Sequence, residues 1–122
     1  MNAQIRGFQL TVRAWRRDLK LSQEARDHSW DELSAKEAEV HAASQAHIEL
    51  VLADASKEAL QESRDKCIKL QAVSGYIRGK YHEICDSVTL ARKEIAAIQA
   101  DIKRLELEAM KASLKVDKSE TP

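Results

Sequence analysis

Proline, glycine and aromatic residues are scarce in this chain of 122 residues, and their scarcity removes most fold classes. The one proline is the last residue, Pro122, and the three glycines are Gly7, Gly75 and Gly79. Aromatic residues make up only 4% of the chain. A β-sheet needs turn residues between its strands and β-branched or aromatic side chains on its surface, so sheet structure is close to excluded. Long helices with few interruptions are what remains.

The chain also lacks long apolar runs, paired cysteines and a net charge. No wholly apolar run is longer than the four residues of 50–53, so no segment is long enough to span a bilayer. Two cysteines, Cys67 and Cys85, are too few for a disulfide framework, and nothing at the N-terminus is typical of a secretory signal. We therefore expect a cytoplasmic protein. A net charge of zero and the lack of a reader motif argue against a nucleic-acid partner.

A seven-residue repeat in the second half is the clearest pattern that is present. With Tyr81 at position a of a heptad abcdefg, fourteen of the fifteen a and d positions are apolar or cysteine, and only Ser74 differs. The a positions are Cys67, Ser74, Tyr81, Val88, Ile95, Ile102, Ala109 and Val116. The d positions are Leu70, Ile77, Ile84, Ala91, Ile98, Leu105 and Ala112. Such a repeat is typical of a coiled-coil seam.

The first half shows a weaker helical pattern. Apolar residues recur at steps of three and four, a spacing that keeps them on one side of a helix. They are Phe8, Val12, Trp15, Leu19, Trp30, Leu33, Val40, Ile48, Val51, Ala55 and Ala59. Polar residues such as Ser22 and Arg26 interrupt this side. A helix restart at residues 27–32 is an alternative, because Ser29 and Glu32 have the spacing of a capping box.

Charge along the heptads favours an antiparallel arrangement. In a parallel dimer Asp101 at position g would face Glu106 at position e of the other chain, and no g-to-e pair of opposite charges within residues 67–116 would offset this repulsion. We therefore predict an all-α fold, an elongated antiparallel helical hairpin, that forms one unit over residues 1–116 with a polar tail at 117–122. The predicted turn lies near residues 74–79, where Ser74, Gly75 and Gly79 allow backbone freedom. A turn near residues 54–56 is the alternative.

The N-terminal segment, within residues 2–27, has the pattern of a basic amphipathic helix. Its apolar and basic side chains fall on opposite sides of a helical wheel, which is typical of helices that lie on an anionic membrane or in the groove of a partner protein. An ordinary bundle helix with its charges in solvent and a mitochondrial presequence are the alternatives. The predicted partner-binding residues are Phe8, Val12, Trp15, Leu19, Arg13, Arg16, Arg17 and Trp30.

Catalytic chemistry has no support in the sequence. No glycine-rich phosphate loop or nucleophile elbow is present, and a thin helical fold offers no cavity that could exclude water from an acid pair. His82 and Cys85 lie three residues apart, but zinc sites normally show tighter and repeated spacings. We therefore predict no catalytic, cofactor-binding or metal-binding residues, and no enzymatic activity.

The small surface that two helices can bury against each other indicates a binding function. One seam stabilises a chain of this size poorly, so we expect a protein partner or self-association through helical seams, with an anionic membrane surface as an alternative partner. In length and two-helix layout the chain resembles the stalk subunits of type III secretion ATPases, the FliJ and YscO type. Its basic N-terminal segment before a long hairpin also resembles membrane-remodelling proteins of the ESCRT-III type, although zero net charge departs from their basic core.

The predicted function is therefore that of a non-enzymatic coiled-coil interaction or scaffold protein, a small helical subunit of a larger assembly. The two resemblances imply alternatives within this class: a stalk-like subunit of a secretion ATPase, or a protein held at the periphery of a membrane by its N-terminal helix.

Overall fold

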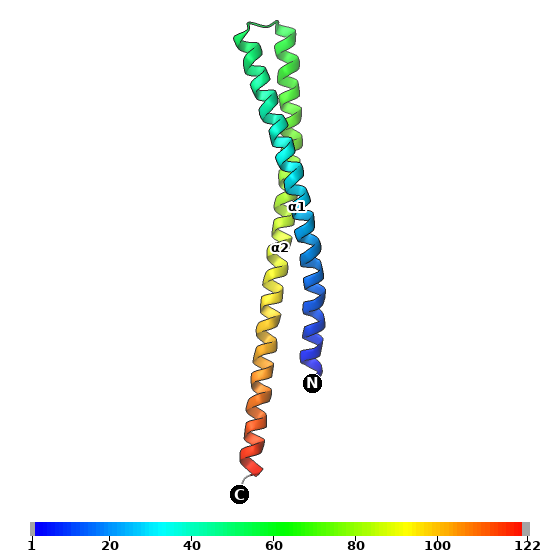
Figure 1. The fold of residues 1–122 in the computed structure, drawn as a ribbon, viewed down its shortest axis with the longest axis vertical. Coiled ribbons are helices and arrows are strands. Elements are labelled where there is room, and N and C mark those ends of the chain that lie inside the picture. The colour runs from blue at the N-terminus through cyan, green and yellow to red at the C-terminus, as the bar shows by residue number, and fades with distance from the viewer. Residues whose placement is uncertain (1, 121–122) are drawn as a thin grey trace. The chain divides into compact units, whose positions relative to one another are not determined.

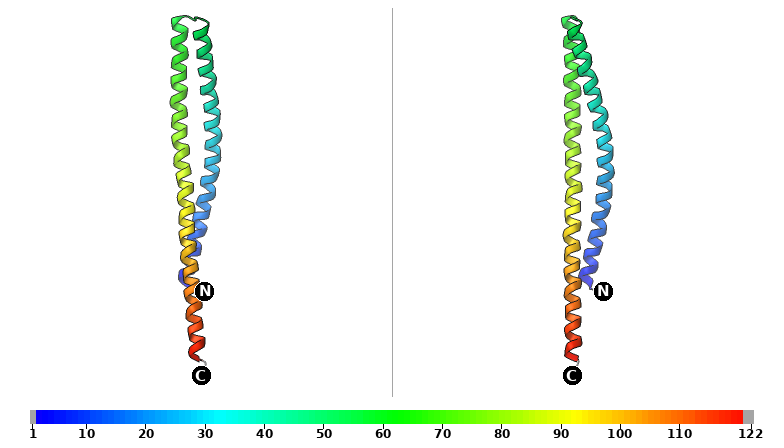
Figure 2. Two further views of the ribbon diagram at one scale, coloured as in Figure 1. Left: turned by 90° about the vertical axis from the view of Figure 1, so that its left-hand side faces the viewer. Right: turned by 60° about the vertical axis from the view of Figure 1, so that its left-hand side comes forward.

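The protein consists of two long helices in the computed structural model. The structure describes the backbone of residues 2–120 and the side chains of residues 2–115. Helix α1 covers Ala3–Leu52 and helix α2 covers Lys57–Glu120. They run in opposite directions and pack against each other (Figure 1; Figure 2). The structure confirms the predicted all-α fold and antiparallel helical hairpin.

The connection between the helices is short and carries a cap on each side. Asp54 has a φ of 53°, and the amides of Asp54 and Ala55 donate to the carbonyls of Val51 (3.1 Å) and Leu50 (3.0 Å), the bonding pattern of a Schellman motif. Asp tolerates this left-handed backbone better than most residues with a Cβ. On the far side the amide of Ala59 donates to the Ser56 hydroxyl at 3.2 Å, so Ser56 is the N-cap of α2.

The predicted turn near residues 74–79 is wrong, and the alternative near residues 54–56 is the correct position. Gly75 and Gly79 lie inside α2, and neither has a positive φ. A glycine within a helix costs only about 1 kcal/mol relative to alanine, so it permits a turn without enforcing one. A chain reversal needs the helix ends to be capped, and the caps are at Asp54 and Ser56. The alternative of a helix restart at residues 27–32 is not found, because α1 continues through these residues.

Helix α1 follows a strict heptad that the sequence pattern concealed. Every a and d position from Ile5 to Leu50 is buried or half-buried, at alternating steps of three and four. The a positions are Ile5, Val12, Leu19, Arg26, Leu33, Val40 and His47. The d positions are Phe8, Trp15, Ser22, Ser29, Lys36, Ala43 and Leu50. Polar side chains therefore occupy five of these fourteen positions.

The heptad assigned to α2 holds over most of its length. Each predicted a and d residue from Cys67 to Leu105 is buried or half-buried, and the repeat extends back to Leu60 and Ser63. The prediction is wrong for Ala109 and Ala112, which are exposed, because α2 runs on past the start of α1 (Figure 2). The side chain of Val116 lies outside the described residues.

The hairpin divides into two compact units. The terminal unit contains residues 1–22 and 87–122, which are the start of α1 and the end of α2, and the loop unit contains residues 23–86 with the connection. The backbone of the predicted polar tail is helical up to Glu120, whereas Thr121 and Pro122 lie outside the described residues. That residues 1–116 behave as one unit stays a prediction.

Candidate interaction surfaces

The register of the loop unit is fixed by polar contacts between the helices. His47 Nδ1 and Ser63 Oγ lie 3.0 Å apart, so an a position of α1 faces a d position of α2. Beside the seam, Arg78 Nη2 lies 2.6 Å from Glu37 Oε1, and both residues occupy e positions. This alternation of a and d partners is the usual layering of an antiparallel coiled coil. In this register the numbers of two residues that share a layer add up to 110, as those of His47 and Ser63 do. Lys36 therefore lies opposite Ser74.

The seam of the terminal unit is almost wholly apolar. Its best buried side chains, each 2% to 9% exposed, are Ile5, Val12, Val88, Ala91 and Ile95. Two open depressions flank the seam, one of about 360 Å³ and one of about 320 Å³. The first has Val12 and Ile102 on its walls and the second has Trp15 and Ala91, so these side chains of α1 face α2.

The predicted partner-binding residues are thereby separated into two groups. Phe8, Val12, Trp15 and Leu19 are buried or half-buried at a and d positions, where they contribute to the hairpin itself. The basic residues Arg13, Arg16 and Arg17 are exposed, and Trp30 in the loop unit is 52% exposed. The apolar side of the N-terminal helix is thus taken up within the hairpin, as in the alternative of an ordinary bundle helix. A partner-binding role for the exposed residues stays a prediction.

Trp30 belongs to an aromatic cluster on the loop unit. Its ring centroid lies 5.4 Å from that of Tyr81, and the Tyr81 ring lies 5.8 Å from the ring of His82. A hydrogen bond between the side chains of Tyr81 and Cys85, together with partial burial, raises the pKa of Tyr81. One turn away, Lys80 Nζ lies 4.7 Å from the centre of the Tyr76 ring, and a hydrogen bond with the Tyr76 side chain raises the pKa of Lys80.

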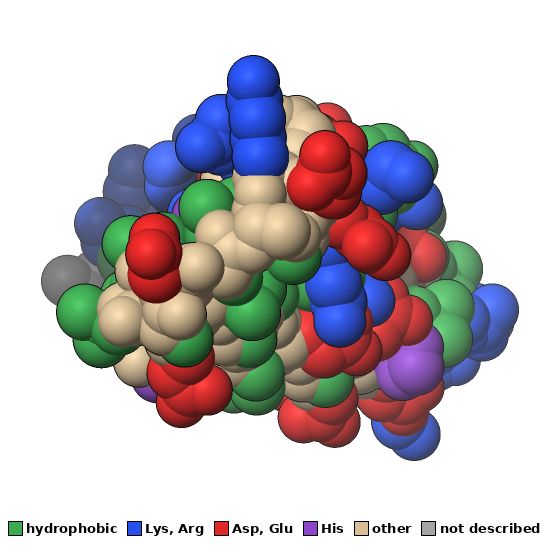
Figure 3. Space-filling model, turned by 90° about the horizontal axis from the view of Figure 1, so that it is seen from above, with side chains coloured by type: hydrophobic (Ala, Val, Ile, Leu, Met, Phe, Trp, Pro, Cys, Tyr) green, Lys and Arg blue, Asp and Glu red, His purple; other side chains and the backbone are tan. Residues whose placement is uncertain are grey.

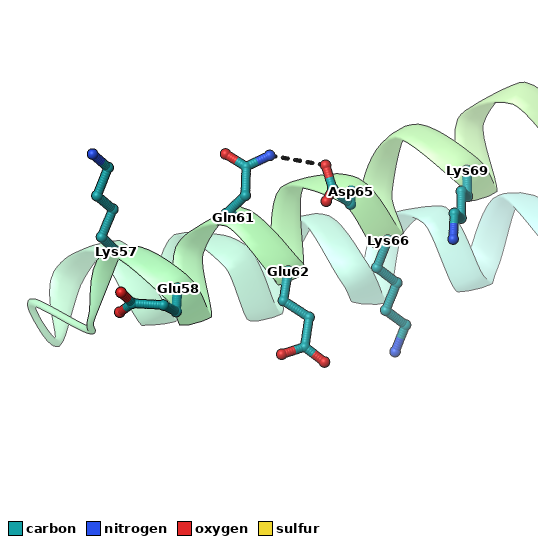
Figure 4. Close-up of a pocket in the computed structure, with 7 residues that line it drawn as sticks. All are labelled: Lys57, Glu58, Gln61, Glu62, Asp65, Lys66 and Lys69. Atoms are coloured by element: carbon teal, nitrogen blue, oxygen red, sulfur yellow. Dashed lines mark hydrogen bonds between the residues drawn. The ribbon is translucent and has the colours of Figure 1, made fainter.

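A depression of about 830 Å³ at the start of α2 offers no enclosed site. Its lining residues all come from the first turns of α2 and carry charges of both signs, with Gln61 Nε2 donating to Asp65 Oδ1 at 2.9 Å (Figure 4). A hollow between side chains of one helix face stays open to water and cannot desolvate a ligand. Among the residues that the structure describes there is no cluster of three or more side chains able to hold a metal ion.

The C-terminal part of α2 carries a group of exposed apolar side chains in the terminal unit. Every side chain described from Glu106 to Lys115 is exposed. Leu107, Met110 and Leu114 are 48%, 56% and 55% exposed and lie three and four residues apart, so they form a row on the side of α2 opposite the seam. The spacing of these three residues is visible in the sequence, but the heptad repeat predicts the opposite side of the helix, with Ala109 and Ala112, as the contact surface.

Charge differs between the two units although the whole chain is neutral. The terminal unit contains twelve Lys and Arg residues against seven Asp and Glu, whereas the loop unit contains eight against thirteen. Acidic and basic side chains are both visible in the view onto the end that carries the connection (Figure 3). The terminal unit is therefore suited to acidic partners, and the loop unit to basic ones.

Comparison of the chain with protein-family models, with curated proteins and with solved structures found no match. No helix within the described part of the chain has the length and apolar character needed to cross a membrane.

Proposed function

We propose that this protein is a non-enzymatic coiled-coil interaction subunit that binds a partner protein through the C-terminal part of α2. The observation that supports this most is the row formed by Leu107, Met110 and Leu114, which is exposed on a helix segment that no other described segment covers. The open, shallow depressions of the hairpin favour binding over catalysis, because chemistry usually needs a pocket that excludes water.

The physical reason is the low stability of an unsupported helix in water. Most of the stability of a helix in a protein comes from tertiary packing of its apolar face rather than from helix propensity. The segment from Glu106 to Glu120 extends α2 beyond its packing against α1, and its described side chains have no contacts that bury them. A groove that accepts anchors spaced three and four residues apart would supply those contacts, which is how amphipathic helices are commonly bound.

Two narrower functions belong to the same class. A stalk-like subunit of a secretion ATPase is supported by the two-helix architecture alone. Attachment to a membrane through the apolar side of the N-terminal helix has less support, because Val12 is 5% exposed and faces α2.

The proposal predicts that a double substitution in the row removes binding without harming the fold. Leu107→Glu with Leu114→Glu should leave the melting temperature within about 2 °C, because exposed positions contribute little to stability. It should reduce recovery of the wild-type partners by at least about tenfold, since anchors placed at the centre of an interface dominate its affinity. Affinity purification from native extract with quantitative mass spectrometry measures the recovery.

Ala109→Glu with Ala112→Glu is the matched control, since it makes the same change of charge at two exposed positions on the opposite side of the same helix segment. The control should retain the partners. The proposal is wrong if the leucine variant keeps all of them, or if the protein turns over a substrate and recovers no partner.

A further inference from the structure

The outer side of α2 in the loop unit has an open and mostly apolar middle. Ile68 and Tyr76 are 56% and 64% exposed, and Ala72, Gly75 and Gly79 are exposed as well. All five occupy b, c or f positions, which lie away from the centre of the seam with α1. Beyond the neighbouring backbone, a Cβ placed on Gly75 or Gly79 would meet nothing within 4 Å. The helix backbone is therefore open to a close neighbour at both glycines.

Polar and charged side chains lie at both ends of this surface. At one end Gln61 and Asp65 point to the same side of α2, and Gln61 Nε2 donates to Asp65 Oδ1 (Figure 4). At the other end lie His82 and Asp86, and all four residues are exposed at b or f positions. Residues 61–86 contain five Lys and Arg against four Asp and Glu. A strongly charged partner would therefore gain little on this nearly neutral surface.

The middle of the surface complements itself when two α2 helices run antiparallel. If the numbers of facing residues add up to 147, each b residue meets an f residue of the other copy. Ile68 then faces Gly79, and Ala72 faces Gly75. A large apolar side chain thus enters the open space above a glycine, and the helices can approach closely where the side chains are smallest.

The two ends complement each other in the same register. Asp65 faces His82, so a carboxylate meets a ring N–H that can donate to it. Gln61 faces Asp86, so a side-chain amide meets a carboxylate. Any heptad allows b residues to face f residues, but here each of the facing pairs also joins groups that suit each other.

The c positions flank this contact with one attraction and one repulsion. Lys69 comes beside Tyr76 of the other copy, whose ring face attracts an ammonium group. Glu62 comes beside Glu83 of the other copy, and because both are exposed, water and salt weaken their repulsion. The flanks therefore nearly cancel, and the apolar middle should supply most of the affinity.

A parallel pair of α2 helices fits these observations less well. Each residue would then face its own copy, so that Asp65 would meet Asp65 and Asp86 would meet Asp86, both with repulsion. Gly79 opposite Gly79 would leave a gap without contacts.

We propose that the outer side of α2 in the loop unit is a docking surface for a second copy of this chain, with the two α2 helices antiparallel. The two-fold axis passes between residues 73 and 74, so each facing pair occurs twice. The contact covers residues 61–86 of both copies, which belong to the loop unit and to one continuous helix. The inference does not depend on the proposed function, which uses the segment from Glu106 to Glu120.

Sedimentation equilibrium of the full chain at about 0.15 M salt tests the surface. The wild type should dimerise with a dissociation constant below about 100 µM. Gly79→Glu and Ile68→Glu should each weaken the dimer at least about tenfold, because both place a carboxylate in the apolar middle of the contact. Gly7→Glu is the matched control, since Gly7 lies on α1 and a Cβ there also meets nothing within 4 Å. This control should dimerise as the wild type does.

Disulfide cross-linking tests the direction and the register of the two helices. In a chain with Cys67→Ala and Cys85→Ser, a mixture of the Asp65→Cys and His82→Cys variants should form a disulfide between copies. Neither variant alone should do so, because in the antiparallel register the two copies of residue 65, or of residue 82, lie about 25 Å apart along the helices.

Circular dichroism should show Gly79→Glu and Ile68→Glu to be as helical as the wild type, because both positions are exposed. If one of them unfolds, the other decides. A wild type that is monomeric at about 100 µM, or a folded variant that dimerises as the wild type does, would overturn the proposal. Cross-links within each cysteine variant alone, or no mixed product, would overturn the antiparallel register. Dimerisation that is lost only on replacement of Leu107 and Leu114 would assign self-association to the row of the proposed function instead.

Discussion

The terminal unit and the loop unit use the same heptad register but fill it with different side chains. In the terminal unit eleven of the twelve a and d residues are apolar, and Ser22 is the exception. In the loop unit six of sixteen are polar or charged, and they include Arg26, Lys36 and the bonded pair of His47 and Ser63. An uninterrupted heptad therefore does not require an apolar residue in every layer.

This difference separates the side chains that stabilise the hairpin from those that set the register of its two helices. Burial of apolar side chains is the main favourable term in folding, so the terminal unit should supply more stability per layer. Polar groups in a seam lower stability, but they can fix register because misaligned layers leave them without partners. Within the described residues no buried side-chain polar atom lacks a partner, which is consistent with this role in the loop unit.

The largest expected effect is a charge placed in the apolar seam. Val88 is 2% exposed, so Val88→Asp buries a carboxylate without a cation and should lower the free energy of unfolding by about 3–5 kcal/mol. Ser74 is also buried, at 5% exposure, but it shares its layer with Lys36, so Ser74→Asp should cost about 1 kcal/mol or less. Urea denaturation followed by circular dichroism measures both. Equal losses would show that the two seams do not differ in their tolerance of charge.

A smaller contrast is expected between the two tryptophans. Trp15 is half-buried at a d position of the terminal unit, and Trp15→Ala should cost about 2–3 kcal/mol through lost burial and the cavity left behind. Trp30 is 52% exposed at the edge of the loop unit, and Trp30→Ala should cost less than about 1 kcal/mol. Thermal melts of the two variants compare them. A larger loss for Trp30 would mean that the aromatic cluster supports the loop unit more than its exposure indicates.

The smallest expected effect is a gain in the loop unit. Lys36 occupies a d position, its side chain is 26% exposed, and its ion pair with Glu39 (2.9 Å) lies at the surface. Lys36→Leu should therefore stabilise the protein by about 1 kcal/mol, because apolar burial replaces a weak exposed pair. Native-state hydrogen exchange should show the added protection in residues 23–86 and little change elsewhere. Loss of protection there would show that Lys36 has a structural role beyond that pair.

Much of the fold could be predicted because the apolar a and d positions in the sequence of α2 are the positions that pack against α1. From Cys67 to Leu105 the apolar a and d positions are the covered positions. Helix α1 follows the same geometry, but Arg26 and Lys36 conceal it, because a long side chain can lay its methylene groups along a seam and keep its charge in solvent. A search for apolar residues alone does not detect such positions.

The candidate surfaces were harder to predict, since exposure depends on what the other helix covers. Phe8 and Trp15 have the pattern of a binding face, and α2 covers them. Leu107 and Leu114 have no distinctive pattern beside the heptad at Ala109 and Ala112, yet they are exposed because they lie on the side of α2 opposite the seam.

By itself the sequence determined the helical class, the antiparallel pairing and the α2 seam, because scarce turn residues, heptad spacing and charge act locally or between neighbouring turns. Only the tertiary structure decided that the chain reverses at Asp54 to Ser56 rather than at Gly75, and this position sets which residue of α1 meets which residue of α2. The reason is that the position of the turn depends on how much side-chain surface both helices bury along the seam, and the α1 heptad contributes as much to this burial as the α2 heptad. A glycine offers local freedom to turn, but that freedom is small beside the free energy gained by burying apolar side chains along the seam.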